Sequence, residues 1–428
     1  MLLSLFFIVL AVMMLAGVPI YLSLIGASLS YVIMHPELSM IIAIQKMINA
    51  PNSFTLLAVP FFIFAGQVMN YGGVTDRIFG FANALIGHYR GGLGYVNVFA
   101  SVLFAGMSGS AIADAGGLGL IEIKAMRDAG YDDDFSIGVT ASSSLIGPII
   151  PPSIPFVVYG AVAGVSIGGL FIGGLIPGLM MALSLCVMVY FTAKKRNYQP
   201  LPKASARERW VAFKRAFLSI LTPAIIIGGI WFGLFTPTEA AFVSIVYALV
   251  VTIFIYKEQK LSALPGLALE TLWTVGPAIM IVAAANIFGW IMNYEKVDVY
   301  LMNVLFSYTK NKYVILFLIN VLLLIMGMFL EVVAAVMIML PLTAPIIQQL
   351  DIHPIHFGVI MVLNLMIGLL TPPVGFVLYI LASVAKVPVG QVIRICIPWT
   401  IPLLIVLLLI TYIPGLVMWL PRVLGFVS

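Results

Sequence analysis

Four prolines and a glycine interrupt an apolar run of membrane-spanning length at residues 147–155, where the sequence is GPIIPPSIP. Proline lacks a backbone N–H and clashes with the preceding turn, so a helix must break there. In hydrocarbon each unpaired backbone group is costly, and a broken helix is tolerated only where it lines a cavity or a ligand site. The break therefore indicates a polar ligand site inside a membrane.

The composition fits only a polytopic helical membrane protein. Of the 428 residues, 62% are hydrophobic and 9% charged, and the apolar runs are continuous rather than alternating, which excludes a β-barrel. Cys186 and Cys396 both lie in apolar runs, so we expect no structural disulfide. The N-terminal run has no basic flank and does not resemble a cleaved signal peptide. The net charge of +5 is read as basic loops, not as nucleic-acid binding.

The apolar runs predict full spans, interfacial helices and interrupted elements. The expected spans are residues 1–16, 18–34, 54–70, 169–193, 217–235, 238–256, 268–293 and 391–420, with a short polar link at 35–51. Residues 74–88 and 297–309 look interfacial, as does the basic stretch 194–215 with its Trp210. Residues 95–125 carry small polar residues at 106–110, which predicts a re-entrant hairpin with its tip there. Residues 135–165 form the broken span.

The interrupted elements occur twice. Six identical residues recur at an offset of 221 over about 70 residues. The pairs are Gly106 and Gly327, Met107 and Met328, Gly147 and Gly368, Pro151 and Pro372, Pro152 and Pro373, and Pro177 and Pro398. A second hairpin is thus expected at 313–347 and a second broken span at 357–383. Paired breaks in corresponding halves are the best sequence pointer to a transporter's binding site.

Basic residues predict the orientation of the chain. If the first hairpin has its base in the cytoplasm, 16 of the 21 Lys and Arg lie inside and 5 outside. The second hairpin then has its base outside, so the repeats are inverted and both termini are periplasmic. We expect an all-α membrane protein with inverted structural repeats, two re-entrant hairpins and two broken helices. Its elevator-type scaffold would be 1–92, 167–312 and 386–428, and its transport domain 93–166 and 313–385.

The predicted core contains no cationic side chain. No Lys or Arg lies within 95–123, 135–193 or 313–385. Oxygen-bearing side chains are present instead: Ser108, Ser110, Asp114, Ser142, Ser143, Ser144, Ser153, Glu331, Thr343, Asn364 and Thr371. With free carbonyls at the breaks, these oxygens suit Na⁺, and nearby half-helix N-termini suit anionic groups.

Each of these side chains also has a structural interpretation. A carboxylate in the membrane is costly unless it is functional, which favours a substrate or ion role for Asp114 and Glu331, but either acid can be a hydrogen-bonded structural group. The serines at 142–144 can bond to their own helix. Glu239, within the sequence TPTEAA, is expected to cap a helix. His353 and His356 have no third ligand, so no transition-metal site is predicted.

The sequence resembles the large membrane subunit, of the DctM/SiaM type, of tripartite ATP-independent periplasmic (TRAP) transporters, over essentially the whole chain. The most specific segments are TPTEA at 236–240, GMSGS at 106–110 with Asp114, GPIIPPS at 147–153 and GMFLE at 327–331. The resemblance implies a bacterial inner-membrane elevator carrier coupled to Na⁺, with no further cofactor. It also implies a small four-helix membrane subunit, not expected to be fused here, and a periplasmic substrate-binding protein.

The resemblance also implies the site residues. One Na⁺ site maps onto Ser108, Gly109, Ser143, Gly147 and Pro148, and another onto Gly327, Glu331, Thr371 and Pro372, with Asn364 added as the counterpart of Ser143. Substrate would lie near Ser110, Asp114, Ser153 and Glu331. A dicarboxylate between two acids without an arginine would be repelled, which favours a hydroxyl-rich monoanion such as sialic acid (N-acetylneuraminate) over a C4-dicarboxylate.

Two other functions stay open on the residues alone. A Na⁺/anion symporter that needs no binding protein would share the same repeats, and a channel or a structural membrane subunit would share the hydropathy. A hydrolytic enzyme is not expected, because no Ser–His pair or metal triad lies in the core.

Overall fold

The computed structural model describes residues 2–427, and those residues form helices and turns without a β-strand. The first third contains α1 (Leu2–Leu15), α2 (Ile20–Ile33), α3 (Met40–Asn49), the 3₁₀ turn η1 (Phe54–Leu57), α4 (Ala58–Tyr71) and α5 (Val74–Ile86). The centre contains α11 (Ile167–Arg196), α12 (Ala206–Trp231), α13 (Pro237–Leu249) with the π-helical η3 (Val250–Ile255), η4 (Leu261–Ala263), α14 (Leu264–Tyr294) and α15 (Val297–Tyr308). The chain ends with α20 (Val389–Tyr412) and α21 (Gly415–Val423).

The helices are interrupted at the places where the two hairpin tips and the two breaks were predicted. The first hairpin comprises α6 (Gly92–Ser108), α7 (Ala111–Ala113), the π-helical η2 (Asp114–Leu118) and α8 (Gly119–Asp128), and the first broken span comprises α9 (Asp133–Ser144) and α10 (Ile154–Ala163). The second hairpin is α16 (Lys312–Phe329) with α17 (Val332–Gln349), and the second broken span is α18 (Pro354–Gly368) with α19 (Phe376–Ala385). A cis peptide bond lies in each break, at Pro151–Pro152 and at Pro372–Pro373.

Within the described residues, eight helices are long and apolar enough to cross a membrane. Local signals explain where several of them begin. Ser205 and Thr236 form capping boxes with Glu208 and Glu239, and Pro237 occupies the first turn of α13, where its missing N–H costs nothing. The cap predicted for Glu239 is therefore confirmed.

Three boundaries differ from the prediction. The link at 35–51 contains α3, an amphipathic helix with one buried residue, Ala43. The basic segment 206–215 is the start of α12 and continues into the span, because nothing between the two breaks the helix. The final span ends at Tyr412, before Pro414 removes a backbone donor, and α21 follows it.

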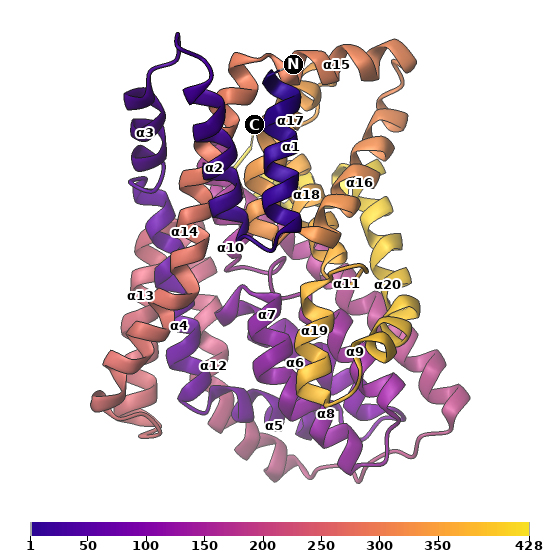
Figure 1. Ribbon diagram of the computed structural model, residues 1–428. Coiled ribbons are helices and arrows are strands. Elements are labelled where there is room, and N and C mark those ends of the chain that lie inside the picture. The colour runs from indigo at the N-terminus through magenta and orange to yellow at the C-terminus, as the bar shows by residue number, and fades with distance from the viewer. Residues whose placement is uncertain (1, 428) are drawn as a thin grey trace.

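The two hairpins lie in opposite halves of the molecule, α6–α8 in the lower half of Figure 1 and α16–α17 in the upper half. Each hairpin packs against the far helix of the other hairpin's broken span. The first hairpin contacts α19, and the second hairpin contacts α10. This reciprocal packing holds the two tips and the two breaks in one central layer.

Charged contacts gather at the lower end of the molecule. Arg77 pairs with Glu258 at 2.8 Å, and Arg127 pairs with Asp133 at 2.6 Å. The Arg196 guanidinium lies 2.8 Å from the Asp132 carboxylate, which also accepts a hydrogen bond from Tyr198. The Tyr198 hydroxyl and Arg196 hold the pKa of Asp132 below its usual value. The Arg77 pair joins α5 to the segment after η3, and the Arg196 contacts join the basic stretch 194–215 to the turn between the first hairpin and α9.

Candidate functional site

The first hairpin tip meets the first break through glycine. Gly109 has a left-handed backbone (φ +57°), and a Cβ atom there would lie 2.4 Å from the Pro152 carbonyl oxygen. Only glycine allows this approach, because other residues rarely adopt this φ and would overlap the break. Ser108 precedes it, and its buried hydroxyl has no hydrogen-bond partner among the described residues.

Asp114 lies at the centre of this junction. It starts the π-helical η2, an irregularity frequent at functional sites, and its side chain is fully buried. Ser101 donates to one of its carboxylate oxygens at 3.4 Å, and the other oxygen, Oδ2, has no partner within residues 2–427. A Cβ atom on Gly147 would lie 3.8 Å from Oδ2 and 3.7 Å from the Ser110 carbonyl oxygen. The carboxylate thus faces the start of the break.

Two residues that the sequence interpretation overlooked support this junction. The Asn97 amide nitrogen donates to Glu122 at 2.6 Å and to Thr140 at 2.7 Å, and its oxygen accepts the Ser143 hydroxyl at 2.7 Å. Asn97 and Glu122 are both fully buried. Both interrupt the apolar run 95–125, and that signal alone could have identified them. They fix the orientation of Ser143.

The remaining polar residues of the first break are engaged locally. Ser153 donates to the Pro148 carbonyl oxygen and accepts from the Phe156 amide at 3.3 Å, so it caps α10. Ser110 caps α7 in the same way. Ser144 bonds to its own helix at 2.8 Å, as the structural interpretation expected, whereas Ser142 donates across to the Trp399 carbonyl oxygen at 3.1 Å.

The second tip and the second break form a similar junction. A Cβ atom on Gly327 would lie 3.2 Å from the Gly368 Cα, and the Gly375 amide donates to the Met328 carbonyl oxygen at 3.2 Å. The Asn364 amide nitrogen donates to the Asn320 side-chain oxygen at 2.9 Å. The Asn364 side-chain oxygen has no partner among the described residues. Asn320, on α16, was not anticipated from the sequence.

Thr371 and Glu331 hold the backbone of this second junction. Thr371 directly precedes Pro372, and its hydroxyl donates to the Ile367 carbonyl oxygen at 3.0 Å. The Glu331 carboxylate accepts from the Val333 amide at 2.8 Å and from the Ala334 amide at 3.4 Å, so it caps α17. This position at a helix N-terminus stabilises a negative charge.

The histidine pair has hydrogen-bond partners of its own. His353 accepts from the Ile355 amide and caps α18, and His356 Nε2 donates to the Ile410 carbonyl oxygen at 2.7 Å. In the part of the chain that the structure describes, no three His, Cys, Asp or Glu side chains are placed to hold a metal ion.

The two junctions share a chemical character. Each joins a hairpin tip to a broken helix, and each contains buried oxygen that no donor within residues 2–427 satisfies, on Ser108 and Asp114 in the first and on Asn364 in the second. Buried oxygen atoms without partners are costly, and in native proteins they indicate a missing ion, water or ligand. Hydroxyl, amide and carboxylate oxygens are ligands for hard cations.

A family model for the DctM component of tripartite ATP-independent periplasmic transporters matches residues 7–416. The chain belongs to this family. Its members are components of membrane transporters, so the protein is a transport protein of the bacterial membrane and not an enzyme. The permease is 47% identical over 407 residues, 95% of each chain, to the sialic acid TRAP transporter large permease protein SiaM of Vibrio cholerae.

Two further relatives and one solved structure complete the comparison. The sialic acid TRAP transporter permease protein SiaT of Haemophilus influenzae is 45% identical over 96% of this chain and 67% of that one. The C4-dicarboxylate permease DctM of Pseudomonas aeruginosa is 38% identical over 94% of each chain. The YdaH transporter of Alcanivorax borkumensis aligns with a TM-score of 0.63 at 15% identity, covering 92% of this chain and 96% of that one, which shows a shared fold.

Proposed function

We propose that the permease carries out Na⁺-coupled uptake of a sialic-acid-type sugar acid across the inner membrane. In this proposal a periplasmic binding protein delivers the substrate and a small membrane subunit completes the complex. The observation that carries it is the set of unsatisfied buried oxygens where the hairpin tips meet the breaks, on Ser108, Asp114 and Asn364.

Sodium would account for the oxygens of Ser108 and Asn364, and the substrate for that of Asp114. The first ion would lie near Ser108, Gly109, Ser143 and the break at Gly147 and Pro148, and the second near Gly327, Asn364 and the break at Thr371 and Pro372. A cation at either place satisfies groups that the protein leaves unpaired, and it offsets their desolvation cost. Each Na⁺ that enters down about 100 mV contributes about 2.3 kcal/mol.

The substrate assignment has two supports. Residues 95–123, 135–193 and 313–385 contain no Lys or Arg, so an anion there depends on Na⁺ and helix N-termini for charge balance. The single negative charge of a sugar acid needs less compensating positive charge than the two charges of a dicarboxylate. The hydroxyl and amide groups of the sugar acid can also donate hydrogen bonds to Asp114 and Glu331. The relatives named for sialic acid are also more similar to this chain than the C4-dicarboxylate permease of Pseudomonas aeruginosa.

Alternating access by an elevator movement follows from the same architecture. The hairpins lie in opposite halves, and the sequence offset of 221 relates their tips and breaks. Inverted repeats around a central site are typical of carriers in which one body moves against another. In this proposal the tips and breaks move together and carry the site with them.

Reconstitution tests the proposal. Liposomes that hold the permease and its small subunit, with the binding protein outside, should accumulate N-acetylneuraminate only under an inward Na⁺ gradient. Equal uptake in K⁺-only buffer would refute the coupling. Uptake without the binding protein would instead favour the self-sufficient symporter.

Single substitutions extend this test to the ion sites. Ser108→Ala and Asn364→Ala each remove one unsatisfied oxygen, and each should raise the Na⁺ concentration for half-maximal uptake about tenfold, the effect of losing roughly 1–2 kcal/mol. Ser144→Ala is the matched control, because that buried hydroxyl bonds only to its own helix.

A further inference from the structure

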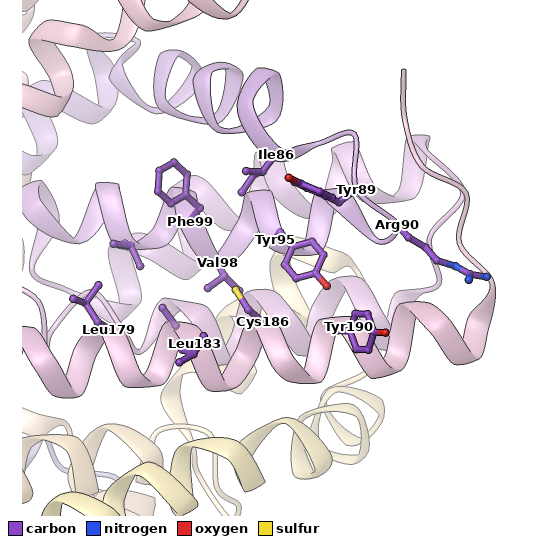
Figure 2. Close-up of a pocket in the computed structure, with 12 residues that line it drawn as sticks. Ile86, Tyr89, Arg90, Tyr95, Val98, Phe99, Leu179, Leu183, Cys186 and Tyr190 are labelled. Carbon is purple, nitrogen blue, oxygen red and sulfur yellow. The ribbon is translucent and has the colours of Figure 1, made fainter. Parts of the chain in front are cut away.

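An apolar groove of 660 Å³ opens on the side of the first hairpin, away from the junctions. Its walls come from α6 and α11, and the α5–α6 turn closes one end. Figure 2 shows Val98, Phe99, Leu179 and Leu183 directed into it. Leu179 and Leu183 are 55% and 67% exposed, so the groove is open to the hydrocarbon around the protein.

The groove changes character along its length. Figure 2 shows Leu179 and Leu183 at one end and Tyr190 and Arg90 at the other, with Tyr89 and Tyr95 on the same side as Arg90. Tyrosine is enriched where hydrocarbon meets the headgroup layer, and arginine extends beyond it. The groove therefore runs from acyl-chain depth to the membrane surface.

Its length matches one leaflet. Leu179, Leu183, Cys186 and Tyr190 are spaced three or four residues apart and share one face of α11. The rise from Leu179 to Tyr190 is about 16 Å, and half of the hydrocarbon core is about 15 Å. One acyl chain can thus lie along the whole face.

Two cations at the polar end are available to an anion. Lys194 follows Tyr190 by four residues and continues the face that lines the groove. Arg90 is fixed there by a hydrogen bond to Asn197, while Gly91 packs on Ala193. Among residues 2–427, Arg77, Arg127 and Arg196 have carboxylate partners within 4.0 Å, whereas Arg90 and Lys194 have none.

We propose that this groove binds an anionic phospholipid of the leaflet on the Arg90 side. One acyl chain lies along Leu179, Leu183 and Cys186, and the headgroup phosphate contacts Arg90 and Lys194. Charge favours a lipid over a helix of another subunit, because the two cations lie at the membrane surface directly beyond the apolar part, where they attract an anionic headgroup.

Photocrosslinking in membranes tests the proposal on the permease with its small subunit. The complex is reconstituted in phosphatidylcholine vesicles that contain either phosphatidylglycerol or phosphatidylcholine with a diazirine on one acyl chain. Adducts are then located by peptide mass spectrometry. Phosphatidylglycerol should label residues 179–183 several-fold more than phosphatidylcholine does. Both lipids should label the exposed residues Val321 and Ile325 of α16 equally, because they lie on the face of that helix opposite to its one basic residue, Lys312.

Charge variants distinguish a specific lipid-binding site from ordinary boundary lipid. Arg90→Gln and Lys194→Gln should each lower the phosphatidylglycerol preference roughly fivefold, since a basic residue near an anionic headgroup contributes about 1 kcal/mol. Lys195→Gln is the matched control, because Lys195 lines a different pocket together with Arg394 and Trp399, and it should leave the preference unchanged.

Three results would overturn the proposal. The first is equal labelling of residues 179–183 by the two lipids, and the second is a preference that survives both charge variants. The third is labelling that appears only when the small subunit is omitted, which would assign the groove to a helix of that subunit. Size-exclusion profiles establish that each variant is folded.

Discussion

Asn97 connects three polar side chains in the buried interior. Its amide nitrogen donates to Glu122 and Thr140, and its oxygen accepts from Ser143, so both N–H groups of the amide are used. Hydrogen-bonded buried networks hold their members in place, whereas a network that has lost one member leaves an uncompensated polar group. Ser143, at the end of α9, depends on this network for its position.

Glu122 is therefore expected to act through Asn97 rather than by direct contact with the ion. Glu122→Ala removes the acceptor and should raise the Na⁺ concentration for half-maximal uptake about tenfold, because an unsatisfied buried amide costs roughly 1–3 kcal/mol. Glu122→Gln keeps an oxygen acceptor and should retain an uptake curve close to that of the unmodified protein. The measurement is the Na⁺ dependence of uptake in proteoliposomes.

The control for this pair is Asp128→Ala, an exposed acid at the end of the same helix. A Glu122→Gln variant as impaired as Glu122→Ala would contradict the positioning role and would instead assign the negative charge itself to transport.

The sequence predicted the polar site residues that lie within or beside a glycine-rich or proline-rich motif. It did not predict the polar residues that stand alone in an apolar helix. Ser108 and Asp114 lie in or beside a glycine-rich tip, and the structure gives both an unsatisfied oxygen. Asn97 and Asn320 lie alone on helices, and only the packing of α6 on α9 and of α16 on α18 gives them partners. Ser153 and Glu331 were predicted as substrate ligands, and their helix-capping bonds could not be read from composition.

At the scale of elements, each hairpin tip closes onto its broken helix with almost no space between the two backbones. Gly109 approaches the Pro152 carbonyl oxygen, and Gly327 approaches Gly368. These contacts use glycine where any side chain would separate the two elements. A tip that cannot close would leave the proposed ion site open to water.

Gly109→Ala should accordingly abolish uptake, with a decrease of at least about tenfold. The added methyl group overlaps a carbonyl oxygen, and a left-handed backbone costs alanine about 1–2 kcal/mol. Uptake per inserted molecule is the relevant measurement, with insertion quantified by immunoblot. Gly276→Ala is the control, because a Cβ atom there has nothing within 4 Å. Normal uptake by Gly109→Ala would show that tight closure is not required.

The element order was largely predictable, because proline and glycine clusters are strong local signals. Both hairpins and both breaks appear where those clusters predicted them. The helix α3 was not predicted, because the segment 35–51, with Glu37 and Lys46, was interpreted as a short polar link. The reciprocal packing of each hairpin on the other broken span depends on contacts that are distant in sequence, and no local pattern encodes it.

The whole molecule is electrically asymmetric. The lower end in Figure 1 carries α5, the base of the first hairpin and the start of the basic stretch 194–215, and one arginine of each forms an ion pair with a nearby acid. Positively charged loops remain in the cytoplasm during insertion. This asymmetry supports a cytoplasmic lower end.

Cysteine accessibility tests that orientation. Lys310→Cys lies in the exposed turn between α15 and α16 at the upper end, and Lys203→Cys lies in the exposed loop after α11 at the lower end. A membrane-impermeant maleimide should label Lys310→Cys in intact cells and Lys203→Cys only after permeabilisation. The background is Cys186→Ser, since Cys396 is fully buried. The opposite pattern would invert the assignment.

Trp399 attaches the first broken span to the last long helix. Its ring packs against Phe135, and its carbonyl oxygen accepts a hydrogen bond from the Ser142 hydroxyl. A Cβ atom added to Gly138 would lie 2.2 Å from the indole nitrogen, so the indole occupies the space that this glycine leaves free. If the elevator movement proposed above carries Ser143, these contacts must either break or carry α20 with it. Because α20 exposes Ile401 and Ile405, a helix α20 that moved with the proposed site would displace lipid, and the viscosity of the bilayer would then influence the turnover rate.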